Sequence, residues 1–431
     1  MLWFFKTTSR TGLARWRGCC GVAALVVASC VSVAAQTGTT VSRQVKQKRS
    51  ADDKTPMQLF PVETLWKLAL NNPLTAAPAY DETRGFFPLE GDQLVAYDLL
   101  ARRRLWIASI RTTVEPVVGN GLVLIFEPEA LVALRVEDGT VAWKVPSADD
   151  VAVPPALEGE WLVTATTEGD IIARRARDGS VVWRQHLDAP AHARPEITST
   201  RIFVPTSDSV VVALDSRTGM RLWNRRLGKA GNEILAAGER LYLGSEDRYF
   251  YCLNTRTGVV EWRWPTGANV IGRPVVDDQR VYFVSLDNVL RSMNVSNGVQ
   301  QWKSGLPVRP TTGPLKWSKT IVVTSTAPSL KAYNAEDGKS AGEVYTTSEL
   351  SAPPHLLTEP SLPFPVLVVV TSDITGRATV TASTRTVEPE MTKIASLPNA
   401  IAVPVPVDPP KDLGKVTPLP TLFQVNPAVG P

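Results

Sequence analysis

Residues 213–223 read ALDSRTGMRLW, and residues 252–262 read CLNTRTGVVEW. The same frame returns over residues 293–302 as MNVSNGVQQW. Each copy contains an Asp or Asn and, a few residues later, a Gly. This pattern predicts a tight turn, because an Asx side chain bonds the backbone ahead of it and glycine adopts a positive φ. A tryptophan then ends each copy, so the middle of the chain is built from repeats.

The spacing of tryptophan gives the length of the repeat. Seven residues are separated by 40, 37, 40, 40, 39 and 40 positions, namely Trp66, Trp106, Trp143, Trp183, Trp223, Trp262 and Trp302. Between them, short apolar runs alternate with turn residues and leave no room for helices. Four short strands with a period of about forty residues are typical of a propeller blade. We therefore predict an all-β propeller made of four-stranded antiparallel blades.

The repeat tryptophans have a structural interpretation. A single blade cannot bury both of its faces, so a flat indole on the outer strand is expected to fill the gap to the next blade rather than to stack on a ligand. Prolines recur 10 to 12 residues after a tryptophan, as at Pro116, Pro195 and Pro314. Proline is tolerated at the start of a strand, so these positions are expected to begin the innermost strands.

The number of blades depends on how the ring closes. Six units end at Trp106 through Trp302, and a seventh ends at Gly342, where the register expects tryptophan. An eighth unit over residues 353–386 has no clear outer strand, while residues 58–68 have no unit of their own. Pairing these two would close the ring and remove its exposed edges. We predict eight blades closed by the N-terminal strand, with seven blades as the alternative.

Basic residues at the N-terminus indicate export. Residues 1–35 contain four basic side chains and no acid, and the rest of the chain has 42 bases and 42 acids. A neutral chain gains little affinity for phosphate backbones, so no nucleic-acid partner is expected. The basic segment precedes an uncharged run over 18–35 that ends in Val33-Ala34-Ala35. This layout predicts a cleaved secretory signal over residues 1–35.

Two other interpretations of the leader stay open. Val27-Ala28-Ser29-Cys30 resembles a bacterial lipobox, which makes Cys30 a candidate for lipidation and an N-terminal lipid anchor the only expected contact with membrane. An uncleaved anchor is the third interpretation, although an 18-residue run is near the lower limit for a spanning helix.

The flanks of the repeat region differ from it in composition. Residues 36–56 are polar and charged and are expected to form a linker before a propeller over residues 57–387. Residues 388–431 contain ten prolines, which predicts a disordered or polyproline-like tail.

Residue types that carry chemistry are scarce. Beyond the leader Cys252 is the only cysteine, which excludes an internal disulfide, and its strand-like surroundings predict a buried apolar role. His186 and His192 have no third ligand at a metal-like spacing and are expected to be solvated. The recurring acids are residues that the turns require. We therefore predict no catalytic residue, no metal and no cofactor.

Three arginines suggest an interaction site. Arg194 and Arg273 each precede a proline 11 residues after a tryptophan, and Arg309 precedes Pro310 in the next unit. Equivalent positions of a closed ring lie on one face near the axis. The three side chains are therefore candidates for a positive rim that recognises a carboxylate or an acidic partner. The alternative is three separate solvated side chains.

The repeat resembles a known family. YLGS over 242–245, YCLN over 251–254 and the following Thr257, Gly258 and Trp262 resemble the quinoprotein-type, PQQ-like propeller repeat. This repeat is found in PQQ-dependent dehydrogenases and in the BamB family of the outer-membrane β-barrel assembly machinery. The chain shows neither a vicinal cysteine pair beyond its leader nor a recognisable calcium site, which favours the BamB-like branch.

That branch implies a function without chemistry. The resemblance predicts a protein-interaction scaffold in the periplasm or on the periplasmic face of the outer membrane. Its partners would be envelope proteins, including the β-barrel assembly machinery. A PQQ-binding dehydrogenase with calcium, or a degenerate relative of one, is the runner-up, and a ligand- or glycan-sensing propeller is the third hypothesis.

Overall fold

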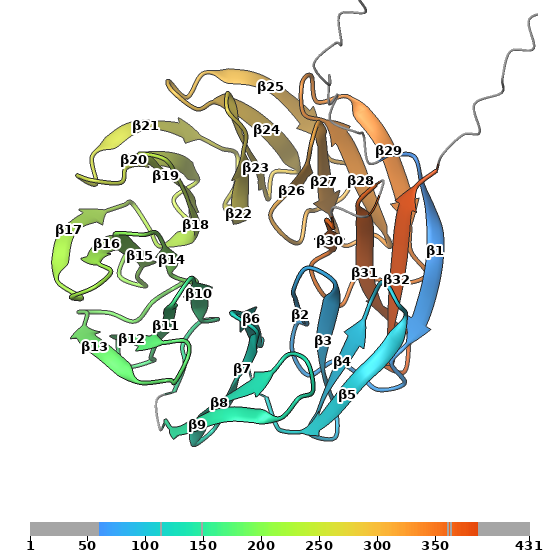
Figure 1. Cartoon of the computed structure of the whole chain (residues 1–431). Coiled ribbons are helices and arrows are strands. Elements are labelled where there is room, and N and C mark those ends of the chain that lie inside the picture. The colour runs from blue at the N-terminus through green and yellow to red at the C-terminus, as the bar shows by residue number, and fades with distance from the viewer. Residues whose placement is uncertain (1–59, 113, 148–149, 360–361, 363, 387–431) are drawn as a thin grey trace, which may run out of the picture. The chain divides into compact units, whose positions relative to one another are not determined.

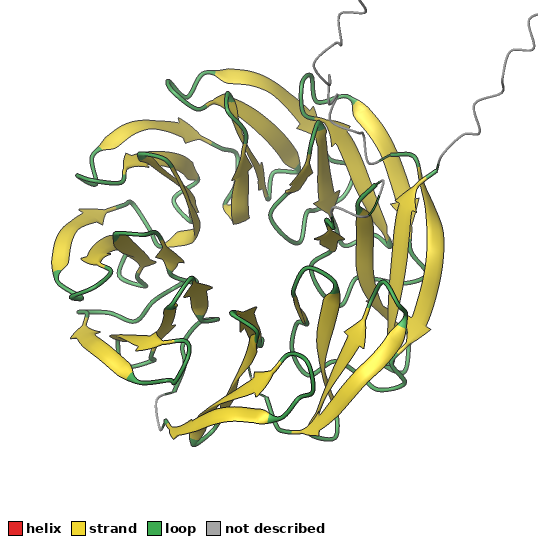
Figure 2. Cartoon of the chain, viewed as in Figure 1, coloured by secondary structure: helices red, strands yellow, loops and turns green. Residues whose placement is uncertain are grey.

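Short strands joined by tight turns build the whole of the described structure. The computed structural model describes residues 60–386 except 113, 148–149, 360–361 and 363, all within the unit Thr55–Pro431. These residues form 32 β-strands in eight four-stranded antiparallel sheets. Figure 1 shows the sheets as blades around an axis, and Figure 2 shows only strands and loops among the residues described. The predicted eight-bladed β-propeller is confirmed, and the seven-bladed alternative is wrong.

Four blades form the first half of the ring, and their strands run from the axis to the rim in chain order. Blade 1 contains β2 (Ala79–Tyr80), β3 (Arg84–Leu89), β4 (Gln93–Asp98) and β5 (Arg103–Ser109). Blade 2 contains β6 (Val117–Gly119), β7 (Leu122–Glu127), β8 (Ala130–Arg135) and β9 (Val141–Pro146). Blade 3 contains β10 (Ala156–Glu158), β11 (Trp161–Ala165), β12 (Asp170–Arg175) and β13 (Val181–His186). Blade 4 contains β14 (Glu196–Ile197), β15 (Arg201–Pro205), β16 (Val210–Asp215) and β17 (Arg221–Arg226).

The second half repeats this plan up to the last blade. Blade 5 contains β18 (Gly231–Ala237), β19 (Arg240–Ser245), β20 (Tyr249–Asn254) and β21 (Val260–Pro265). Blade 6 contains β22 (Val270–Val276), β23 (Arg280–Ser285), β24 (Val289–Asn294) and β25 (Gln300–Gly305). Blade 7 contains β26 (Leu315–Trp317), β27 (Thr320–Thr324), β28 (Ser329–Asn334) and β29 (Ser340–Tyr345). Blade 8 contains β30 (His355–Leu357), β31 (Val366–Ser372), β32 (Ala378–Arg385) and, outermost, β1 (Val62–Ala69).

The two ends of the repeat region meet in blade 8. Strand β1 pairs antiparallel with β32, with Trp66 opposite Ala382 and Val62 opposite Arg385. Figure 1 shows β1 at the rim beside β32. The predicted closure by the N-terminal strand is thus confirmed, and this pairing covers the edge that β32 would otherwise expose.

The hydrophobic core is divided among the gaps between blades. Eight clusters of buried side chains are present among the described residues, and each combines residues of two neighbouring blades. The cluster between blades 4 and 5, for example, joins Phe203 to Ile234 and Leu243. A blade therefore depends on both of its neighbours to remove its apolar faces from water.

Proline marks where most inner strands begin. A proline immediately precedes β2, β6, β10, β14, β26 and β30. Pro274 instead lies inside β22, where the pairing with β23 is irregular between Ile271 and Val275. The inner strands lie at the axis, so the residues beside these prolines line the centre of the ring.

The remaining predicted segments lie outside the described residues. These are the leader over 1–35 with Cys30, the linker over 36–56 and the tail over 388–431. Within the part of the chain that the structure does describe, no helix has the length and apolar character needed to cross a membrane.

Candidate functional site

The repeat tryptophans lie between blades. Six indole N–H groups each donate a hydrogen bond of 2.9–3.2 Å to a backbone carbonyl of the next blade, those of Trp106, Trp143, Trp183, Trp223, Trp262 and Trp302. Trp66 on β1 packs against the cluster between blades 8 and 1. These side chains contact neighbouring blades, so the functional site has to be sought elsewhere.

The axis of the ring contains a cavity of about 430 Å³. Its lining comes from the inner strands of blades 1, 2, 3, 4, 6 and 8 and from the residues just before them. The side chains that carry charge or a titratable group are Tyr80, Glu115, Glu158, Arg194, Glu196, Arg273 and His355. A cavity of this size with convergent polar groups is the default candidate for a binding site.

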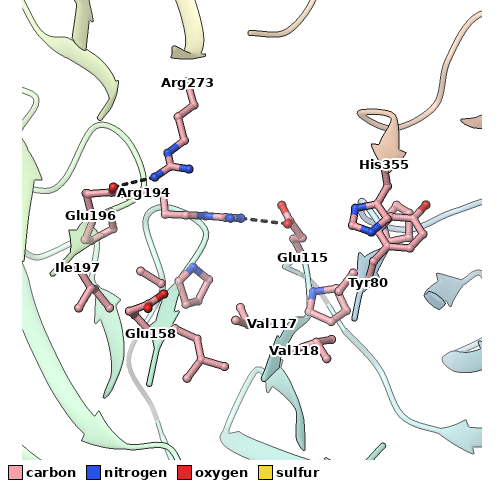
Figure 3. Close-up of a pocket in the computed structure, with 17 residues that line it drawn as sticks. Tyr80, Glu115, Val117, Val118, Glu158, Arg194, Glu196, Ile197, Arg273 and His355 are labelled. Carbon is pink, nitrogen blue, oxygen red and sulfur yellow. Dashed lines mark hydrogen bonds and ion pairs between the residues drawn. The ribbon is translucent and has the colours of Figure 1, made fainter. Parts of the chain in front are cut away.

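Two of the three predicted arginines meet in this cavity. Arg194 forms an ion pair of 3.0 Å with Glu115, and Arg273 forms one of 2.7 Å with Glu196. Figure 3 shows both guanidinium groups projecting into the cavity toward their carboxylate partners. Arg273 also donates from Nε to the carbonyl of Ile234 at 3.1 Å. The third arginine, Arg309, is exposed and is not part of the cavity lining.

Each of these ion pairs joins two blades that are not neighbours in the ring. Glu115 precedes the inner strand of blade 2, whereas Arg194 precedes that of blade 4. Glu196 lies in blade 4 and Arg273 in blade 6, and the Glu196 carboxylate also accepts a 2.9 Å bond from the amide of Ala236 in blade 5. The pairs therefore link blades 2, 4, 5 and 6 around the axis.

The charge of the cavity lining differs from the positive charge predicted from the sequence. Its lining contains the three carboxylates of Glu115, Glu158 and Glu196 against the two guanidinium groups of Arg194 and Arg273. Glu158 is exposed, and its carboxylate has no hydrogen bond or ion pair to another described residue. The predicted positive rim is thus neutralised by carboxylates that were not among the predicted site residues.

An aromatic pair forms another part of the wall. His355 of blade 8 stacks on Tyr80 of blade 1, with ring centroids 4.3 Å apart and planes 7° from parallel. Burial lowers the pKa of His355 to about 4, although the charge of Asp81 acts in the opposite direction. Burial likewise raises the pKa of the Tyr80 phenol far above its ordinary value. Both rings are therefore neutral at pH 7 and add no charge to the cavity.

A second hollow of about 390 Å³ adjoins the first. Arg273 lines both, and the second also contains Glu233 together with Thr311, Thr312 and Thr324. Its only ionisable lining residues are Glu233 and the already paired Arg273. The second hollow therefore adds negative rather than positive charge to the axis.

The described residues offer little for a metal. No group of three or more His, Cys, Asp or Glu side chains is close enough together among them to hold one. His186 contacts Asp170 at 2.8 Å, and His192 lies 3.6 Å from Glu246 in a different blade. Cys252 is buried, and burial raises the pKa of its thiol to about 12, so the thiol stays protonated at pH 7.

A calcium–quinone group does not fit this lining. An anionic quinone would need cationic partners, but both guanidinium groups already pair with carboxylates of the same cavity. The calcium ion would need a set of oxygen ligands, and the described carboxylates form no cluster of three. The donor set of the cavity is thus complementary to neither part of the group.

Several residues that line the cavity were not predicted from the sequence, although their positions next to the recurring prolines could have identified them. Glu115 precedes Pro116 as Arg194 precedes Pro195, while Glu196 and His355 directly follow a proline. These three residues lie at the axis for the same reason as the predicted arginines. Only Glu158, three residues after a proline, has a weaker signal.

The fold and the repeats together define a PQQ-like β-propeller. The family model described as outer membrane protein assembly factor BamB matches residues 28–152, 129–236 and 228–354. These segments cover well over half of the sequence. The chain belongs to this family.

Individual relatives are more distant. Outer membrane protein assembly factor BamB of Yersinia pestis is 33% identical over 73 residues, which are 17% of this chain and 19% of that protein. The matched stretch thus spans about a fifth of the relative. The crystal structure of BamB from Moraxella catarrhalis is similar with a TM-score of 0.61 and 17% identity, covering 75% of this chain and 100% of that one.

A solved enzyme has a similar ring. Quinohemoprotein alcohol dehydrogenase from Comamonas testosteroni matches with a TM-score of 0.60 and 11% identity, over 75% of this chain and 76% of the enzyme. At such identities the likeness of both solved structures shows the fold alone. The same fold thus occurs in an assembly factor and in an alcohol dehydrogenase, and function has to be argued from the site.

Proposed function

We propose that this chain is a non-catalytic scaffold of the periplasm that assists the assembly of outer-membrane β-barrel proteins. The observation that carries the proposal is the match of residues 28–354 to the family of outer membrane protein assembly factor BamB. The basic and apolar leader supports export, with Cys30 as a candidate anchor. The partners would then be proteins of the envelope, including the assembly machinery itself.

The chemistry of the axis favours this function over the dehydrogenase. The cavity carboxylates and guanidinium groups mostly neutralise one another, and the described residues form no three-ligand metal group. The thiol of Cys252 is buried and protonated. These observations support binding of a protein partner over oxidation of a substrate alcohol.

The exposed rim is suited to contact. Several large apolar side chains are exposed on the outer parts of the blades, including Met220 at 66% and Tyr345 at 79%. Such side chains give a partner apolar surface to bury. They also provide positions where a photo-crosslinking residue can replace a side chain without disturbing the cores between blades.

Crosslinking in living cells tests the proposal. A photo-crosslinking amino acid is placed at Met220 or Tyr345 of the full chain, the cells are irradiated, and the captured proteins are identified by mass spectrometry. We expect components of the β-barrel assembly machinery, and none in the same cells without irradiation. Capture of unrelated proteins alone at both positions would contradict the scaffold role.

A binding assay tests the runner-up directly. Purified full-length protein is mixed with pyrroloquinoline quinone and calcium, and both quinone absorbance and dye-linked alcohol oxidation are recorded. We expect no stoichiometric binding and no turnover. Quinone bound at one equivalent, with dehydrogenase activity, would establish the enzyme instead.

A further inference from the structure

The charge balance of the axial cavity selects the ligand it can accept. Arg194 and Arg273 each pair with one glutamate, so Glu158 is the ionised lining residue left without a partner among those described. The carboxylate of Glu233 in the adjoining hollow likewise has no ion-pair partner among the described residues and adds to the negative field. An anion entering here would meet carboxylates, whereas a cation would complete the pairing.

We propose that the axial cavity binds a guanidinium or primary ammonium group, with Glu158 as its principal carboxylate partner. The cation source is either an arginine or lysine side chain of a partner protein or a small free amine. This inference rests on the cavity alone and does not depend on the scaffold function proposed above.

The walls suit the stem of such a group. Figure 3 shows Val117, Val118 and Ile197 around the cavity together with Glu158. A guanidinium group on an alkyl chain buries its methylenes against apolar walls while its head stays among polar groups. The volume of about 430 Å³ falls within the range of small-ligand sites. The cavity thus combines apolar wall with the exposed carboxylate of Glu158.

The aromatic pair does not compete with the cation. The histidine that stacks on Tyr80 is half-buried and neutral at pH 7, so it contributes a flat uncharged wall rather than a further positive charge. Nor are the arginines free to collapse onto Glu158, because each is held by its own carboxylate at 3.0 Å or less. The carboxylate of Glu158 therefore stays available to a cationic ligand.

Isothermal titration calorimetry of the full chain at low salt tests the inference. The probes are agmatine and an acetylated, amidated Gly-Arg-Gly peptide, and the matched uncharged probe is the same peptide with citrulline in place of arginine. We expect at least one cationic probe to bind at one equivalent and the citrulline peptide not to bind. Binding of agmatine alone would assign a small amine, and binding of the peptide a protein partner.

Two variants on one hairpin locate the site. Glu158→Gln is expected to weaken the cationic probe about tenfold or more, because a charge-assisted hydrogen bond is lost. Glu160→Gln removes the same charge two residues away from a side chain that does not line the axial cavity, and it should leave affinity unchanged. Failure of both cationic probes to bind, equal binding of citrulline, or equal effects of the two variants would overturn the inference.

Discussion

At the scale of single residues, six of the eight blade junctions join one indole and one glycine. A Cβ built on the turn glycine of one blade would lie 2.5–2.6 Å from an indole carbon of the preceding blade, at Gly139, Gly179, Gly219, Gly258, Gly298 and Gly338. All six also have positive φ. Glycine is therefore required twice over, by the backbone of the turn and by the indole that lies on it.

Two glycines of blade 5 separate these requirements. Gly258→Ala places a Cβ in the left-handed region and within 2.5 Å of Trp223 Cε3, whereas Gly238→Ala has the same backbone strain with nothing within 4 Å. We expect Gly258→Ala to lower the free energy of unfolding by about 3 kcal/mol or more and Gly238→Ala by about 1 kcal/mol. Urea unfolding of both variants measures the difference. Equal losses would mean that the indole contact is unimportant.

At the scale of elements, the N-terminal segment completes two junctions. Strand β1 supplies the outer strand of blade 8, and Phe60 just before it fills the place of the missing tryptophan of blade 7. A Cβ on Gly342 would lie 2.5 Å from Phe60 Cδ1, so glycine at this position leaves room for the phenyl ring. The seventh blade is thus sealed by a residue far away in the sequence.

Removing that ring tests its role. Phe60 is 4% exposed, and Phe60→Ala is expected to lower the free energy of unfolding by about 3–5 kcal/mol because it leaves a cavity between blades 7 and 8. Leu65→Ala, in β1 but 39% exposed, is the control and should lose about 1 kcal/mol or less. Similar losses in chemical denaturation would contradict the sealing role of Phe60.

At the scale of the whole molecule, blade 8, which closes the ring, packs against blade 1. A titratable group lies at the junction between these two blades. His355 stacks on Tyr80 there. An ordinary histidine has a pKa of 6.5, whereas burial lowers the pKa of His355 to about 4. As pH falls, the unfolded chain therefore binds the proton first. This stability is fully present above pH 6.5 and is lost between pH 6.5 and 4.

The pH dependence of unfolding gives the corresponding prediction. Between pH 7 and 4.5 the wild-type protein is expected to lose roughly 2 kcal/mol more than a His355→Gln variant, since the variant lacks the titrating ring. Urea midpoints at several pH values measure both curves. Parallel curves for the two proteins would show that the histidine is not protected in the folded ring.

Local patterns predicted most of the fold. Eight blades and their closure could be predicted from the spacing of tryptophan, the Asx–Gly turns and the unpaired segment near Trp66. This was possible because the contacts that hold each blade recur at a fixed period in the sequence. Phe60 could not be anticipated in this way. It breaks the period and reaches Gly342 only through the folded ring.

The axial site was less accessible to sequence reasoning. The register placed Arg194 and Arg273 near the axis, and they do line one cavity. It could not reveal that each would be paired with a carboxylate, because each partner lies two blades away in the folded ring. The register of a repeat predicts that equivalent side chains lie at the same level along the axis of the ring. It does not predict which of these side chains form ion pairs between non-neighbouring blades.

The pairing of Val62 with Arg385 also dictates an order of events. The ribosome synthesises β1 long before β32, so β1 in the nascent chain stays unpaired until the last strand has been made. Phe60 also stays unpacked until then, since the junction it fills joins blades 7 and 8. Maturation of the ring must therefore end with the contact of greatest sequence separation, which is the slowest kind to form. Until then, a strand edge and an aromatic side chain stay open to chaperones or to misassembly.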